Sequence, residues 1–101
     1  MKVVLYSMFD TKTSLYHAPI VSINGDSARR HYAQIFANGQ NPYYDYAEDY
    51  QLMAVGTFSD ETGKTEGLGA PEFIAHGTTL AKMADQLKIR RSGEGGIQSE
   101  Q

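Results

Sequence analysis

Apolar and polar residues alternate most regularly between Asp49 and Lys64. Every second residue from position 50 onward shares one side of an extended chain: Tyr50, Leu52, Ala54, Gly56 and Phe58. This period of two predicts a strand with one well-buried side. The segment Asp60–Gly63 follows and predicts a tight turn, because Gly63 can adopt positive φ at no steric cost.

Three further segments have the composition of strands. Residues 3–9 are rich in β-branched and aromatic side chains and predict a first strand. Residues 15–23 predict a second extended segment, in which Pro19 lacks a ladder donor and indicates an edge or a bulge. Residues 64–73 continue past the turn as a fourth strand, interrupted by glycines and a proline.

Two segments have helical spacing instead. After Asn24–Ser27, which offers an N-cap, the apolar positions recur at i, i+4, i+7 and i+8 and predict a helix that ends at Asn38–Gly39: Ala28, Tyr32, Ile35 and Phe36. A second helix is expected after Thr78 or Thr79, with an apolar stripe at Leu80, Met83, Ala84 and Leu87. Residues 40–48 are expected to form a loop.

These elements predict an α+β fold, with a small antiparallel sheet of three to four strands and two amphipathic helices packed on one face. Residues 1–91 are expected to form a single α+β domain. Residues 92–101, rich in glycine and polar side chains, are expected to form a disordered carboxyl-terminal tail. Because one sheet face or edge stays uncovered, we expect a homo-oligomer, with a dimer as the simplest form.

Composition limits the classes of protein. The chain of 101 residues contains no cysteine, which excludes a disulfide framework, a thiol nucleophile and a cysteine-based zinc site. It contains no apolar run long enough to span a bilayer and no amino-terminal signal, so we expect a cytoplasmic protein without a membrane partner.

The net charge of −3 argues against a generally basic nucleic-acid coat. Its distribution is uneven, since residues 41–75 are acidic apart from Lys64, whereas residues 1–40 and 76–91 carry most of the cations. If the two basic segments meet in the fold, they form one positive face. The alternative is an ordinary mixed surface charge.

Two basic clusters are candidate phosphate-binding sites. Arg29 and Arg30 lie off the apolar stripe of the first helix and can contact phosphate in bidentate fashion. The second cluster, at the end of the last helix, contains Lys88, Arg90 and Arg91. The alternatives are solvated surface arginines for the first cluster and stabilisation of the helix dipole for the second.

The loop Tyr43-Tyr44-Asp45-Tyr46 is a candidate base-stacking platform, with Tyr43 and Tyr44 as its expected rings. The alternative is a dimer interface or loop packing, where tyrosine is also common.

Catalysis finds little support in the sequence. His17, His31 and His76 are scattered, and no pair has the i, i+4 spacing of a helical metal site. No Walker-type phosphate loop is present. We therefore expect no enzyme activity, no metal site and no cofactor.

The run from Asp49 to Gly63 resembles the small nonstructural DNA-binding protein of gokushoviruses, the microvirus bacteriophages. The opening Leu5–Lys12 and the Ala28-Arg29-Arg30 centre of the first helix are similar to that family as well. The resemblance implies a noncatalytic protein of the bacterial host cytoplasm that binds single-stranded DNA and supports viral single-strand genome synthesis or packaging. The alternative is an oligomeric interaction module that recruits a viral or host replication protein without binding DNA.

Overall fold

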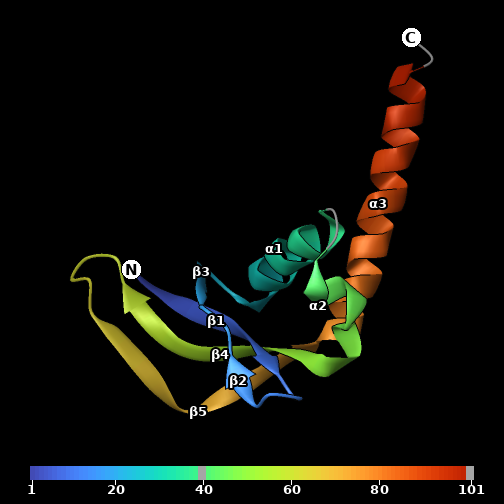
Figure 1. Ribbon diagram of the computed structural model, residues 1–101. Helices are drawn as coiled ribbons and strands as arrows, with labels where there is room; N and C mark the ends of the chain where they lie inside the picture. Colours follow the sequence, from blue (N-terminus) through green and yellow to red (C-terminus); the bar gives the residue numbers. More distant parts are fainter. Residues whose placement is uncertain (39–40, 100–101) are drawn as a thin grey trace.

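The computed structural model describes the backbone of residues 1–38 and 41–99, with side chains for residues 1–38 and 41–90. Its strands are β1 (Lys2–Asp10), β2 (Leu15–Tyr16), β3 (Ile20–Ser22), β4 (Tyr50–Ser59) and β5 (Thr65–His76). Its helices are α1 (Gly25–Ala37), α2 (Pro42–Asp45), the 3-10 turn η1 (Ala47–Asp49) and α3 (Gly77–Ser99). An antiparallel sheet with helices on one side confirms the predicted α+β class (Figure 1).

The sheet has five strands, in the order β2-β1-β4-β5, with β3 also paired to β1. The segment predicted as a single second strand is divided, because β2 pairs with the end of β1 and β3 pairs with its middle. Pro19 lies between the two pieces, where it has no amide hydrogen to give to the ladder. This division explains why the sheet has one strand more than the three to four expected.

The core lies between the sheet and the helices. Met8 of β1 and Leu52 of β4 are opposite each other and fully buried, and Phe36 of α1 and Leu80 of α3 are buried with them. The predicted alternation of β4 is confirmed from Tyr50 to Ala54, since Tyr50, Leu52 and Ala54 are buried whereas the residues between them are only partly so. The register of the ladder then shifts between Ala54 and Gly56, which the sequence did not predict.

Helix α1 begins after Asn24, whose side-chain oxygen accepts a hydrogen bond from the amide of Ser27 at 2.9 Å. Asn24 is therefore the N-cap residue within the Asn24–Ser27 segment. The helix ends at Ala37 with Asn38 as its C-cap, close to the predicted end, and Gly39 lies outside the described residues. Buried alanines, Ala33 on α1 and Ala84 on α3, let the two helices pack closely.

The segment expected to be a loop contains short helical turns. Asn41 caps α2, because its side-chain oxygen accepts from the amide of Tyr44 at 3.0 Å and Pro42 occupies the first turn. The turn η1 then leads directly into β4.

The predicted turn after β4 is confirmed, with Gly63 at φ 76°. The far end of the β4–β5 hairpin, drawn in yellow in Figure 1, extends beyond the helices. The radius of gyration, 15.6 Å, exceeds the roughly 13 Å of a compact chain of this length. The molecule is therefore elongated, with extents of 52, 34 and 17 Å.

At the carboxyl end the structure differs from the sequence prediction, because helix α3 is longer than expected. It continues to Ser99 and its last turns project away from the rest of the chain (Figure 1), where the sequence predicts disorder from Ser92. In the described part of the chain, no helix is both long and apolar enough to cross a membrane.

Candidate nucleic-acid interface

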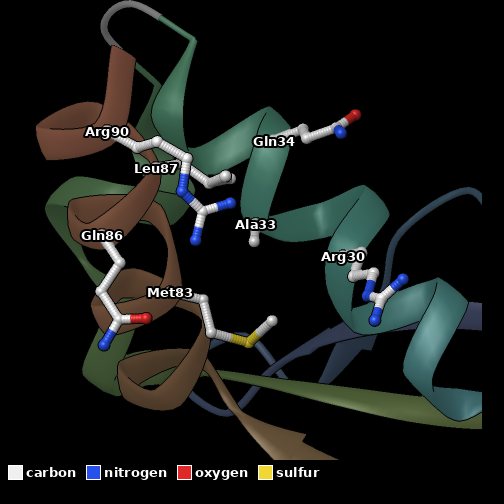
Figure 2. A pocket seen from close by; sticks show the side chains of 7 residues that line it. All are labelled: Arg30, Ala33, Gln34, Met83, Gln86, Leu87 and Arg90. Carbon is white, nitrogen blue, oxygen red and sulfur yellow. The ribbon is translucent and has the colours of Figure 1, made fainter. Parts of the chain in front are cut away.

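Helices α1 and α3 lie against each other and enclose a groove of about 520 Å³ (Figure 2). We call it the α1–α3 groove. Its lining comprises Arg30, Ala33 and Gln34 from α1, and Met83, Gln86, Leu87 and Arg90 from α3.

Helical periodicity places these side chains on the groove. Arg30, Ala33 and Gln34 have the i, i+3, i+4 spacing of one helix face. The α3 residues repeat it, with Met83, Gln86 and Leu87 followed by Arg90 at i+7. Each helix thus contributes one arginine, one glutamine and at least one apolar side chain.

The groove is positively charged. Among the residues with described side chains, the charged ones that line it are Arg30 of α1 and Arg90 of α3 (Figure 2). Both side chains are exposed, and within residues 1–38 and 41–90 neither forms an ion pair. The two basic segments of the sequence therefore meet in the fold through one residue each.

Arg29 has a different role from its neighbour. Its guanidinium pairs with Asp26 at 2.7 Å and donates to the carbonyl oxygen of Ile74 at 3.2 Å. These bonds join α1 to β5 and turn Arg29 away from the groove. The predicted phosphate contact of Arg29 stays a prediction, made from a guanidinium that is already bonded to Asp26 and Ile74.

The side chains of Lys88 and Tyr44 contact each other. The Lys88 ammonium lies 3.7 Å from the centre of the Tyr44 ring, a cation–π contact. The Tyr44 hydroxyl donates to the carboxylate of Asp85 at 2.5 Å, and this hydrogen bond raises the pKa of the phenol. One face of the Tyr44 ring is thus occupied by a cation, which leaves less of it for a base.

Tyr43 belongs to an internal aromatic cluster. Its ring stacks on Phe36 with centroids 5.8 Å apart and meets Tyr50 edge-on at 4.9 Å. Its hydroxyl oxygen lies 2.6 Å from Nδ1 of His17, and burial raises its pKa. The ring is half-buried and one of its faces is stacked on Phe36, which fits the loop-packing alternative, and its role as a base platform stays a prediction.

The side chain of Arg91 lies outside the described residues. The sequence analysis missed the two glutamines, Gln34 and Gln86, although each stands four residues from a groove arginine. That spacing was a signal for a shared helix face. Among the described residues, no group of three or more His, Asp or Glu side chains is arranged to hold a metal ion.

Residues 3–80 match the model of a protein family described as Phage ORF5 protein. The match includes α1 and Arg30 but stops at Leu80, so that the α3 side of the groove lies beyond it. Comparison with curated proteins gave no match, and comparison with solved structures gave none either.

Proposed function

Because this chain belongs to the Phage ORF5 protein family, we propose that it is a phage nonstructural protein of the gokushovirus type that binds single-stranded DNA in the bacterial cytoplasm. In this proposal it supports viral single-strand genome synthesis or packaging by binding alone, without catalysis, metal or cofactor.

The observation that carries the proposal is the pair of arginines in the α1–α3 groove. A guanidinium group presents several N–H donors in a planar fork that matches phosphate oxygens. Arg30 and Arg90 come from different helices and both line the same groove, and the lining residues that the structure describes include no carboxylate to compete for them. Two phosphates of one strand can therefore be held along it.

The rest of the lining suits unpaired bases. Met83 and Leu87 are partly buried and supply apolar surface on which a base face can lie. The amides of Gln34 and Gln86 can donate to and accept from any base edge, so we expect tolerance of sequence. A duplex keeps its bases stacked and hidden, and we expect it to bind more weakly.

The test is the double substitution Arg30→Ala with Arg90→Ala, measured by fluorescence anisotropy on a labelled oligonucleotide at several salt concentrations. Each lost phosphate contact should make the slope of log affinity against log salt shallower by about 0.7, so the double variant should lose up to about 1.4. Because phosphate contacts release counterions from the DNA, the wild-type protein should bind best at low ionic strength.

The control is Lys12→Ala with Lys64→Ala, which removes the same charge from exposed turns outside the groove. Its slope should match that of the wild-type protein. An equal loss in both double variants would show diffuse charge rather than a site. If the wild-type protein has no affinity for DNA at low salt, the proposal fails and protein recruitment replaces it.

A further inference from the structure

The sheet face that points away from the helices, here called the outer face, is rich in apolar side chains. Met8 and Leu52 point into the core, so their neighbours Phe9 and Met53 point the other way. The strand pairings align Tyr16 with Phe9 and both with Gln51. Figure 1 shows no helix on this side of the sheet within the described residues.

The remaining strands extend the outer face in both directions. Phe73 of β5 is opposite Met53, and its ring lies 4.7 Å from that of His76. Val21 of β3 is opposite Leu5 of β1. Several of these side chains stay substantially exposed, with Tyr16 at 45%, Phe73 at 47% and Val21 at 52%.

The outer face also lacks charge. None of the side chains that the pairings place in these rows is Lys, Arg, Asp or Glu. The acidic side chains of β5 fall on the other side, since Glu72 is paired with the buried Ala54. Depletion of charge with enrichment of aromatic residues and methionine is typical of the core of a protein interface.

We propose that the outer face binds the outer face of a second copy of this chain, so that two sheets stack about a two-fold axis. In a contact about a two-fold axis the same surface of both copies meets, so each side chain lies near the same side chain of the partner copy or near its neighbours. A surface with charges of one sign therefore repels the same surface of the other copy. Each chain carries a net charge of −3, and the outer face is a surface on which two copies meet without opposing like charges. The rows of the outer face contain no Lys or Arg, the side chains that usually bind phosphate.

The size of the outer face suits this occupant. The ten residues of β4 extend roughly 33 Å, and four strands about 4.8 Å apart cover roughly 15 Å. The sheet face therefore has a flat area of roughly 500 Å², and the uneven surface of its side chains increases the accessible area. This is comparable in size to the surface of about 800 Å² that each partner buries in a standard interface.

The dimer leaves the DNA site open. The α1–α3 groove lies on the helix side of the sheet, so sheet-to-sheet stacking turns both grooves outward. A dimer thereby carries two accessible grooves, one on each side of the stacked sheets. The contact between the two outer faces does not require DNA.

The test measures mass in solution by multi-angle light scattering and sedimentation, without DNA. The wild-type protein should have twice the mass of the chain at micromolar concentration. Tyr16→Lys and Phe73→Lys each place two like charges in the interface and should raise the dissociation constant of the dimer at least tenfold. Circular dichroism should show that both variants are folded. If Phe73→Lys does not fold, Phe73→Ser is tested in its place.

The matched control is Tyr46→Lys, at an exposed tyrosine between α2 and η1, which should remain dimeric. A wild-type protein that is strictly monomeric at micromolar concentration overturns the proposal. So does a folded pair of outer-face variants that stays as dimeric as the control. Neither result bears on the affinity of the α1–α3 groove for DNA.

Discussion

At the scale of single residues, the close approach of backbone segments decides what a position tolerates. Gly77 stands where β5 passes into α3, next to the turn that precedes β4. A Cβ atom at this position would overlap the carbonyl oxygen of Ala47 and lie 2.9 Å from that of Tyr50. Both obstacles are backbone atoms, so a rotamer change cannot relieve the clash.

We therefore expect Gly77→Ala to lower the free energy of unfolding by about 1–3 kcal/mol, the usual cost of overpacking. The sign is opposite to the gain that alanine gives in an unobstructed helix. Gly67→Ala is the control, because a Cβ atom there meets nothing within 4 Å. Urea denaturation of both variants measures the difference, and equal stabilities would contradict the role of backbone contact.

A second residue, Tyr32, couples stability to pH. Burial raises its pKa from 10.0 to about 12. Because the folded chain holds the proton more tightly than the unfolded chain, this stabilisation is complete below pH 10 and is lost as pH rises through about 12. Each unit of pKa difference corresponds to about 1.4 kcal/mol.

Tyr32→Phe removes the titrating hydroxyl, so its stability should fall less steeply between pH 10 and pH 12 than that of the wild-type protein. Tyr46→Phe, at an exposed ring, should keep the wild-type dependence. Thermal melts across this pH range provide the measurement. Parallel curves for wild type and Tyr32→Phe would show that another group controls alkaline unfolding.

At the scale of elements, α3 has two parts with different roles. Its first turns pack on the core through Leu80 and Ala84, and its middle lines the α1–α3 groove. Its last turns project past the other elements (Figure 1) and contain Gly93, Gly95 and Gly96, which are poor helix formers. A helix end of this composition adds little stability unless something packs against it.

Deletion of residues 93–101 should therefore change the melting temperature by no more than about 2 °C, since no buried apolar side chain of the described core is removed. The matched comparison is Leu80→Ala, which opens a cavity at a fully buried position. This variant should lower the melting temperature by many degrees. Differential scanning calorimetry distinguishes the two. A large drop on deletion would mean that the end of α3 docks on the core.

At the scale of the whole molecule, the sheet separates two surfaces of different chemistry. The helix side carries the arginines of the α1–α3 groove, and the outer face is apolar and uncharged. The acidic side chains Asp60 and Glu61 hold the amino-terminal ammonium at the far end of the hairpin, 2.8 Å from each. An acidic chain can thus keep a local cationic groove, because none of the described lining residues is an Asp or a Glu.

The sequence by itself determined the elements whose evidence is local. Strand β4, the Gly63 turn, and helices α1 and α3 follow from periodicity and turn chemistry, because a strand or helix with one buried face must repeat apolar residues at its own period. The candidate cations were visible in the same way. Periodicity reports which face of an element is buried, and it carries no information about the partner on that face.

Only the tertiary structure decided which candidates share a site. Arg29 and Arg30 are adjacent in sequence, yet Arg29 is bonded to Asp26 and to β5, whereas Arg30 faces a groove completed by Arg90. Tyr43 is half-buried and packs against Phe36 and Tyr50 at the edge of the core. These outcomes depend on contacts between segments far apart in the chain. The packing of helices determines those contacts, and no single segment encodes that packing.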